Sequence, residues 1–481
     1  MASMSDPMAT SDTAVPDLST LFARQREAAS TPDVPASVRV DRLQRAIDLL
    51  VAHQSELCIA LDRDFGQRPA AITRSMDILP AVLSLKYARR HARRWMRPQR
   101  VPIGWPFGWP GARARICYQP LGVVGIISPW NFPITLTFGP LAGALAAGNR
   151  CLIKPSEHTP ALAELLRHLV RTAFDATEVA VVTGGVEVAA AFAALPFDHL
   201  LFTGSTAVGR QVLTAAAAHL VPVTLELGGK SPVVLGRSAD LGRAVDRILL
   251  AKLANAGQMC VAPDHVYLPA DSIDAFTARA KRWVEEAYPP VRLDTDATGI
   301  INGQQLQRVQ ALLSDAAARG ARLIPLTPSR EAPSARLAVP TLVVGANDSM
   351  RLMQEEIFAP ILPLLSYEHI DQVIERIAPA RPLALYYFGS DRREQQRLLA
   401  HTRSGGICIN DVAAQFLIEA LPFGGIGTSG MGAYHGVHGF RRFSHARAIL
   451  HQTRLPIGHW VGLRPPYGRQ LERALALLLG R

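Results

Sequence analysis

Short apolar runs alternate with amphipathic stretches between residues 123 and 227 of this chain. Each run has the length of a buried strand, and each is followed by apolar side chains at helical spacing. Strands and helices that alternate in this way form a parallel sheet with crossover helices. The runs are VVGII (123–127), CLIK (151–154), VAVV (179–182), HLLF (199–202) and VTLEL (223–227). The sequence therefore predicts an α/β fold, and Thr159 is expected to cap a helix that begins at Pro160.

A second series of strands and helices is expected between Pro232 and about Asn410, in which VVL, HVYL, TLVV and ALYYFG are apolar runs. Residues 17–96 have the spacing of helices, with apolar side chains on one face of 38–61. The Pro- and Gly-rich segment 105–114 ends this helical region. A length of 481 residues, 48% of them hydrophobic, is sufficient for two or three domains with buried cores.

The cysteines and the first residues indicate a cytoplasmic protein. The five cysteines are widely spread and form no C-x-x-C pair, so neither a disulfide framework nor a metal site is expected. Residues 1–16 are polar and lack the basic and apolar regions of a secretory signal, which predicts a disordered tail.

Two further features of composition are interpreted without a special function. Residues 116–149 carry no charge, but four prolines in this stretch would break a membrane-spanning helix repeatedly. The formal charge of +11 and the basic stretch 89–100 could attract an acidic partner, yet no nucleic-acid motif accompanies them. We expect no membrane span and no nucleic-acid partner.

Three residues could carry chemistry, each with an ordinary alternative. Cys260 lies in NAGQMCVAPD, a loop that could present its sulfur to a cleft, although a free cysteine is more often a small buried hydrophobe. Glu226 ends an apolar strand where α/β ligand crevices form, so it could act as a base or be a surface residue at a turn. Asn131, between two prolines, could donate to an oxyanion or be a turn residue.

Two glycine motifs fail as nucleotide fingerprints. GGKS at 228–231 lacks the leading glycine of a phosphate loop, because Thr224 occupies that position inside a strand pattern. The glycines of 425–430 match G-x-G-x-x-G by spacing, but they follow LPF and open no clear helix.

Taken together, the motifs resemble those of the aldehyde dehydrogenase superfamily. Residues APD after Cys260, MGAYHG and FSHAR are similar to its class 3 branch, and within it the stretches LKYARRHARRWMRP and LPFDHLLFTGSTAVGR resemble bacterial coniferyl aldehyde dehydrogenases. The superfamily motifs, in order along the chain, are ISPWNFP (127–133), IKPSE (153–157), FTGSTAVG (202–209), LELGGKSP (225–232), GQMC (257–260), EIFAP (356–360) and PFGGIGTSGMG (422–432).

The resemblance implies oxidation of an aldehyde to a carboxylic acid through a thioester on Cys260. A thiolate adds to the carbonyl carbon and later leaves as a good leaving group. Asn131 and the backbone N–H of Cys260 match the oxyanion hole. Glu226 matches the base that activates water against the thioester.

The resemblance also implies a nicotinamide cofactor. Lys154 and Glu157 match the residues at the adenosine ribose, and Gly204 and Ser205 match those at the pyrophosphate. A carboxylate at Glu157 favours NAD over NADP, although class 3 relatives also accept NADP. The other residues that we assign to the cofactor site are Trp130, Gly209, Glu356 and Phe358.

The fold that the resemblance implies has three parts. A variant Rossmann domain for NAD(P) takes residues 17–99 and 122–225, and a catalytic α/β domain takes 226–408. Bridging and oligomerisation segments, with a C-terminal tail, take 100–121 and 409–481. Family members commonly form homodimers or homotetramers, and their partner is a small-molecule aldehyde.

Two departures from the family pattern place the rate and the substrate preference in question. Ala359 stands where the E-I-F-G-P motif has glycine, and Met259 stands beside the nucleophile where threonine is common. Alternatives to an acid-forming enzyme are a coenzyme A-acylating dehydrogenase, which does not need Glu226, and a silent NAD-binding protein. Aromatic cinnamaldehydes are the first expectation for the substrate, and medium-chain aliphatic aldehydes are the second.

Overall fold

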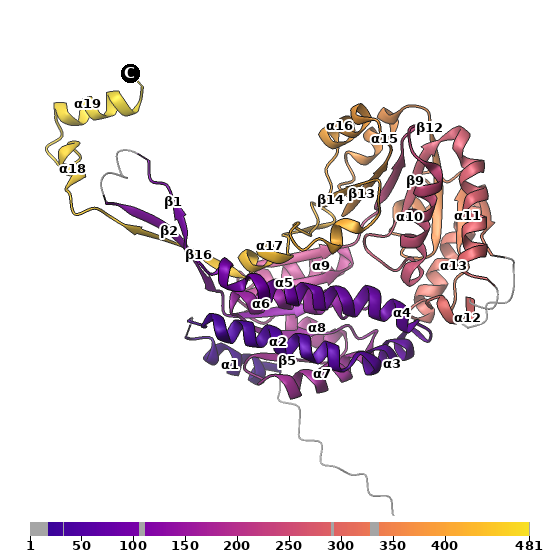
Figure 1. Ribbon diagram of the computed structural model, residues 1–481, viewed down its shortest axis with the longest axis horizontal. Coiled ribbons are helices and arrows are strands. Elements are labelled where there is room, and N and C mark those ends of the chain that lie inside the picture. The colour runs from indigo at the N-terminus through magenta and orange to yellow at the C-terminus, as the bar shows by residue number, and fades with distance from the viewer. Residues whose placement is uncertain (1–17, 32, 105–110, 290–292, 328–335, 481) are drawn as a thin grey trace, which may run out of the picture.

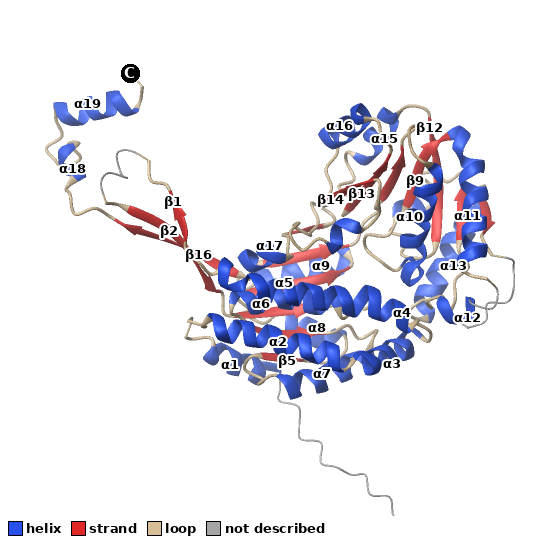
Figure 2. Ribbon diagram, in the orientation of Figure 1, coloured by secondary structure: helices blue, strands red, loops and turns tan. Residues whose placement is uncertain are grey.

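The computed structural model describes residues 18–31, 33–104, 111–289, 293–327 and 336–480 (Figure 1). Strands of the described residues form three sheets, two of which are covered by helices (Figure 2). The tail predicted for residues 1–16 lies outside the described residues, as does 105–110 of the Pro- and Gly-rich segment.

The first sheet confirms the predicted α/β rhythm, because each of the five apolar runs forms a strand. Five strands are parallel, in the order β7-β6-β3-β4-β5, and β15 pairs antiparallel to the edge strand β7. The strands are β3 (Val123–Ile127), β4 (Arg150–Lys154), β5 (Val179–Val181), β6 (His199–Gly204), β7 (Val223–Leu227) and β15 (Gly430–Met431).

The strand order reverses next to β3, which makes this position a switch point. The chain runs from β3 outward to β4 and β5, and then returns to place β6 on the other side of β3. In open α/β sheets, ligands bind in the crevice outside the carboxyl ends of the strands at such a point. The crevice beyond β3 and β6 is therefore the expected ligand site of this sheet.

Helices cover both faces of the first sheet (Figure 2). Residues 38–61 do form helices, but α2 and α3 meet at His53, and the apolar side chains of both are buried in one core. The helices are α1 (Leu18–Ala28), α2 (Ala36–Ala52), α3 (Gln54–Phe65), α4 (Ala70–Ile72), the π-helix η1 (Thr73–Ile78), α5 (Leu79–Trp95), α6 (Thr135–Ala147), α7 (Pro160–Ala173), α8 (Val186–Ala193) and α9 (Thr206–Ala217).

Helix α7 begins at Pro160 as predicted, but its cap differs from the prediction. The side chain of Thr159 makes no capping hydrogen bond. Instead, the carboxylate of Asp64 accepts from the backbone N–H groups of Ala161 and Leu162, at 2.9 and 3.0 Å. A carboxylate at a helix N-terminus satisfies free donors and interacts well with the helix dipole. The cap is supplied from α3, far away in the sequence.

The C-terminal segment contributes directly to the first sheet, beyond the bridging role expected for 409–481. Strand β15 extends the sheet at β7, and α17 (Gly436–Arg442) packs on α6 and α5. The amide of Asn149, which follows α6, donates to the backbone oxygen of Phe443 at 2.8 Å. The last part of the chain thus completes the layer formed by the first half.

The second sheet has seven strands, in the order β10-β11-β12-β9-β8-β13-β14, and it is parallel except for β10. Its strands are β8 (Pro232–Leu235), β9 (His265–Pro269), β10 (Arg322–Pro325), β11 (Thr341–Val344), β12 (Ile361–Tyr367), β13 (Ala384–Phe388) and β14 (Gly406–Ile409). Its helices and turns are α10 (Leu241–Leu253), η2 (Ala254–Gly257), η3 (Ala270–Ser272), α11 (Ile273–Ala287), α12 (Leu293–Asp296), α13 (Gly303–Ala318), α14 (Arg351–Gln354), α15 (Ile370–Ile377), α16 (Arg392–His401) and η4 (Ala414–Leu417).

The third sheet is an arm that extends away from the two α/β layers (Figure 1). It consists of β1 (Gln99–Val101), β2 (Arg113–Pro120) and β16 (Ser444–His451), all antiparallel. Helices α18 (Ile457–Trp460) and α19 (Arg469–Leu478) follow at its far end (Figure 1). No helix among the described residues combines the length and apolar character that a membrane crossing needs.

Candidate active site

Cys260 lies on a tight loop that follows helix α10. The loop passes through three consecutive residues with positive φ, namely Asn255 (49°), Ala256 (54°) and Gly257 (71°). A Cβ on Gly257 would lie 2.5 Å from the backbone oxygen of Ala359, so only glycine fits at this position. The side chain of Gln258 fixes the loop by donating to Gly299 O and accepting from Ile301 N, each at 3.0 Å. Cys260 is thereby held half-buried at a fixed place.

Asn131 belongs to the same cluster of loops. It follows β3, and its side chain is buried. Its amide nitrogen donates to the backbone oxygen of Gln258 at 3.2 Å, and its backbone oxygen accepts from the side chains of Asn255 and Arg68 at 3.0 and 3.1 Å. These contacts join the end of β3 to the cysteine loop, so the amide lies beside the residues that carry Cys260.

Glu226 is buried in β7 with no hydrogen-bond partner. The residue is 1% exposed, and neither carboxylate oxygen has a partner among the described residues. Burial raises the pKa of Glu226 well above its ordinary value, and the charge of Glu356 adds to the shift. The alternative of a surface residue at a turn is therefore wrong. Burial of this kind favours the protonated form of the carboxyl group.

The sulfur of Cys260 shares its surroundings with Glu226 and Glu356. Burial raises the pKa of the Cys260 thiol, and the charges of these two carboxylates raise it further. A Cβ on Gly228 would lie 2.0 Å from Oε2 of Glu356, which places this second carboxyl group against the turn that follows Glu226. The structure thus brings a thiol, two carboxyl groups and the Asn131 amide together from four distant segments.

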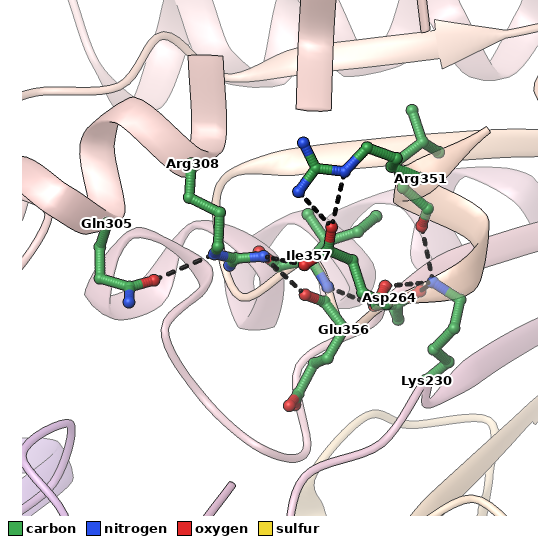
Figure 3. Close-up of polar contacts among 9 residues, drawn as sticks. Lys230, Asp264, Gln305, Arg308, Arg351, Glu356 and Ile357 are labelled. Carbon is green, nitrogen blue, oxygen red and sulfur yellow. Dashed lines mark hydrogen bonds and ion pairs between the residues drawn. The ribbon is translucent and has the colours of Figure 1, made fainter. Parts of the chain in front are cut away.

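A saturated polar network holds the loop of Glu356 and Phe358 (Figure 3). Arg308 donates to the backbone oxygens of Glu356 and Ile357, at 3.1 and 2.6 Å. The carboxylate of Asp264 accepts from Ile357 N at 3.0 Å and from the ammonium group of Lys230. The carboxyl group of Glu356 itself points away from these contacts (Figure 3). The network therefore fixes the backbone of the loop and leaves the side chain of Glu356 available.

The rest of this loop accommodates the departure at Ala359. Phe358 has a positive φ of 50°, and its ring lies 5.4 Å from the ring of Trp130 in an edge-to-face arrangement. Ala359 is fully buried and does not have positive φ among the described residues. Since no left-handed backbone is needed there, alanine can replace the usual glycine without backbone strain.

The residues predicted at the cofactor site lie at the carboxyl ends of the parallel strands. Lys154 ends β4, is 1% exposed, donates to the backbone oxygen of Pro155 at 2.7 Å and forms an ion pair with Glu157 at 3.6 Å. Gly204 ends β6, and Ser205 caps α9 by accepting from Val208 N at 3.3 Å. These positions surround the switch point of the sheet, where a dinucleotide is expected.

Small residues let helix α9 approach the sheet closely. A Cβ on Gly209 would lie 2.6 Å from the side chain of Leu227, and one on Gly204 would lie 2.5 Å from the ring of Phe202. The N-terminus of α9 therefore lies close to the strand ends, and its free N–H groups suit the negative charge of a pyrophosphate. The described residues fit a dinucleotide at this crevice.

An apolar cavity of about 490 Å³ reaches Cys260 from the side of α5, α6 and α10. Its wall includes the side chains of Phe132, Leu136, Met259, Tyr288 and Phe416. Met259, the second departure from the family pattern, thus contributes an apolar surface beside the sulfur. Arg247 and Asp411 are the charged residues on the described wall, and their side chains lie 3.8 Å apart.

Sequence reasoning missed the roles of four residues near this site. Asp264, Lys230 and Arg308 form a network that was not foreseen, because they lie far apart in sequence and no spacing rule connects them. Lys230 was quoted within GGKS and LELGGKSP, and Asp264 within APD, without a role for either. Tyr434 was quoted only within MGAYHG, yet its buried hydroxyl lies among the ionisable groups of the site.

A family model described as "Aldehyde dehydrogenase family" matches residues 11–449. The chain belongs to the aldehyde dehydrogenase family. The predictions of this family, of its α/β fold and of an aldehyde-oxidising enzyme are thereby confirmed.

Relatives of this aldehyde dehydrogenase include named coniferyl aldehyde dehydrogenases. One from Pseudomonas sp. is 47% identical over 447 residues, which cover 92% of each chain. A probable coniferyl aldehyde dehydrogenase from Caulobacter vibrioides is 46% identical over 460 residues, which cover 94% of this chain and 95% of the relative.

Solved structures show the same fold. Staphylococcus aureus AldH in a substrate-bound state has a TM-score of 0.89 and 34% identity, covering 96% of this chain and 99% of that one. An indole-3-acetaldehyde dehydrogenase in complex with NAD+ has a TM-score of 0.82 and 25% identity, covering 90% of this chain and 88% of that one.

Proposed function

We propose that this aldehyde dehydrogenase forms the acid through a thioester on Cys260. The observation that supports the proposal is the convergence of the Cys260 loop, the Asn131 amide and the unpartnered carboxyl group of Glu226. The sulfur adds to the aldehyde carbon, while the Asn131 amide and the Cys260 N–H donate to the developing oxyanion. Glu226 then takes a proton from the water that attacks the thioester.

NAD is the proposed cofactor, because the indole-3-acetaldehyde dehydrogenase of the same fold is an NAD+ complex. Lys154 and Glu157 would hold the adenosine ribose, and the N-terminus of α9 at Ser205 would hold the pyrophosphate. Trp130, Phe358 and Glu356 would border the nicotinamide end, and Gly204 and Gly209 let α9 approach the cofactor. Bound NAD would accept the hydride, and its positive ring would favour the ionised thiol.

Aromatic cinnamaldehydes are the proposed substrates. Two named coniferyl aldehyde dehydrogenases are 46% and 47% identical over more than nine-tenths of this chain. The cavity next to Cys260 has an apolar wall with several aromatic rings, and its volume of about 490 Å³ suits a molecule of phenylpropanoid size. Medium-chain aliphatic aldehydes are the second choice for the same apolar wall.

The decisive experiment replaces the nucleophile. Cys260→Ala should lower NADH formation from coniferyl aldehyde and NAD by at least about 10⁴-fold, because no other group can form the thioester. Cys117→Ala, on strand β2 of the arm, is the matched control and should retain wild-type activity. Activity that survives in Cys260→Ala would contradict the proposal.

A panel of aldehydes tests the substrate class. The values of kcat/KM for cinnamaldehydes should exceed those for short aliphatic aldehydes by about 10-fold or more, because the cavity buries an aromatic ring. A preference for acetaldehyde or propanal would contradict the aromatic assignment and leave the reaction type intact.

We also propose that the protein forms a homo-oligomer and is located in the cytoplasm. The exposed arm suits a homodimer or homotetramer, since it extends away from the layers that bury the core. All five cysteines are free, as in proteins of the reducing cytoplasm. Sedimentation velocity on the purified protein would give the number of subunits.

A further inference from the structure

The hydrolytic step of the proposed reaction leaves a proton on Glu226, which is buried inside the fold. Glu226 is 1% exposed, and its carboxylate oxygens have no partner among the described residues. Each turnover requires that Glu226 lose the proton it has taken from water. A group near Glu226 that can both accept and donate a proton would allow this release.

Tyr434 meets these requirements by position. Its backbone N–H and oxygen pair with Phe423 at 2.8 and 2.9 Å, three residues after the strand that lies opposite Glu226 in β7. The side chain is 1% exposed, and its hydroxyl has no hydrogen-bond partner among the described residues. Burying a hydroxyl group without a hydrogen-bond partner lowers the stability of a fold, so its retention points to a function of that group.

The ring of Tyr434 is held firmly while its hydroxyl remains unpaired. The ring lies edge-to-face with Phe423 and His435, at centroid distances of 5.8 and 4.9 Å. Burial raises the pKa of the Tyr434 hydroxyl, and the charges of Glu226, Cys260 and Glu419 raise it further. The phenol therefore stays protonated, and it lies among both the buried groups of the active site and a third carboxylate.

That third carboxylate, Glu419, lies nearer to solvent than Glu226. Glu419 is half-buried, accepts from the hydroxyl of Ser84, and accepts from Gly436 N at 3.3 Å. Burial raises the pKa of Glu419, so this group takes up a proton more readily than an exposed carboxylate. His435 is the nearest alternative acceptor, but burial lowers its pKa to about 3.

We propose that the Tyr434 hydroxyl passes the proton of the hydrolytic step from Glu226 to Glu419, which releases it to solvent. Ordered water completes the link on either side of the hydroxyl. This inference rests on the proposed role of Glu226 as the base. Tyr434 and Glu419 act through Glu226 and are positioning residues for proton release.

The atoms and charges balance in this step. Glu226 takes one proton from water, the remaining hydroxide bonds to the thioester carbon, and the C–S bond breaks to leave the thiolate of Cys260. Through the linking water on one side, the oxygen of Tyr434 then gains a proton as Glu226 loses one, and through the water on the other side its own proton passes to Glu419, so the phenol and both waters end neutral. No electron is gained or lost in the transfer.

Rapid-quench single-turnover measurements with NAD and coniferyl aldehyde separate the two halves of the reaction. In Tyr434→Phe, we expect NADH formation within about twofold of the wild type, and acid release slower by at least about tenfold. The thioester should then accumulate on Cys260 in the intact mass of the quenched protein. Glu419→Gln should slow acid release in the same way by a smaller factor.

A structural role for these residues is distinguished by two controls. Tyr367→Phe removes another buried hydroxyl, which donates to Leu235 O at 2.7 Å in the second sheet, and it should leave both rates unchanged. Imidazole buffer, raised at constant pH and ionic strength, should accelerate acid release by Glu419→Gln but not by the wild type.

The outcomes separate this inference from the function on which it rests. Wild-type enzyme without a Cys260 thioester would contradict the proposed function itself. A wild-type thioester together with unchanged acid release in both variants would overturn only the relay, as would an equal loss of NADH formation and acid release. If Tyr434→Phe does not fold, Glu419→Gln and its response to imidazole decide the question.

Discussion

Two buried carboxyl groups near the cysteine loop, Asp264 and Glu226, have opposite surroundings. The side chain of Asp264 receives the Lys230 ammonium group, the ring nitrogen of His265 at 3.0 Å and the backbone N–H of Ile357 at 3.0 Å. The Lys230 charge lowers the pKa of Asp264 against the opposing effect of burial. Glu226 has no partner, and its pKa is raised.

This difference separates a structural charge from a reactive one. A buried carboxylate with all its hydrogen bonds made stays ionised and fixes the loops around it. A buried carboxyl group without partners can change its protonation state at little structural cost, which suits a base. The same fold therefore uses the carboxylate of Asp264 to hold the Glu356 loop and leaves that of Glu226 without a partner, as its proposed role in proton transfer requires.

The largest expected effect concerns Glu226. Glu226→Gln keeps the shape of the side chain but removes the proposed base, so acid release should fall by about 10²- to 10⁴-fold. The free energy of unfolding should change by less than about 1 kcal/mol, since no hydrogen bond is lost. Quench-flow assays and urea titration give the two quantities. Glu375→Gln on the exposed surface of α15 is the control.

Asp264 should show the reverse pattern. Asp264→Asn leaves the Lys230 ammonium group without its counter-charge and should lower the free energy of unfolding by about 3 kcal/mol. This value is at the low end for a broken buried ion pair, because Lys230 is partly exposed. Asp371→Asn, which breaks the exposed ion pair with Arg397, should cost less than about 1 kcal/mol. Equal losses of unfolding free energy for the two substitutions in urea titrations would contradict a structural role for Asp264.

The last expected effect concerns stability alone and is a pH dependence caused by Glu356. Burial raises the pKa of Glu356 from 4.5 to about 8, and the charge of Asp264 adds to the shift. Between these values the unfolded chain is ionised and the folded protein is not, so stability falls as the pH rises. The slope is at most about 1.4 kcal/mol per pH unit.

Glu356→Gln removes this contribution. Relative to the wild type, the variant should gain stability steadily from pH 5 to pH 8 and no further above pH 8. Urea titrations of both proteins at several pH values measure the difference. A constant difference over this range would show that Glu356 is ionised in the folded protein.

The parallel strands of the first sheet could be predicted from the sequence, but the surroundings of the site residues could not. The run VTLEL correctly indicates a strand that ends near Glu226, because strand formation depends on local apolar character. The burial of its carboxyl group depends on β15, which comes from a two-residue stretch among glycines, about two hundred residues later. No local pattern signals such a short strand.

The hydrogen-bond and ion-pair partners of these residues could not be predicted from the sequence either. Asp64 rather than Thr159 satisfies the first donors of α7, although Thr159 has the better residue type for a cap by its position in the chain. Lys230 contacts Asp264, a residue 34 positions away, and no spacing rule connects the two. Motifs indicated the proposed reacting groups because a family likeness covers them, whereas the contacts around these groups follow from the tertiary fold.

The pairing of β2 with β16 has a consequence for biosynthesis. Residues 113–120 bond to residues 444–451 in the arm, and the edge strand β15 of the first sheet comes from residues 430–431. A ribosome that extends the chain at about 5 to 20 residues per second must add more than 300 residues after β2 before the partner strand β16 exists. Nascent polypeptides of this enzyme therefore carry an unpaired strand edge on β2 for tens of seconds of synthesis, during which that edge is open to pairing with other chains.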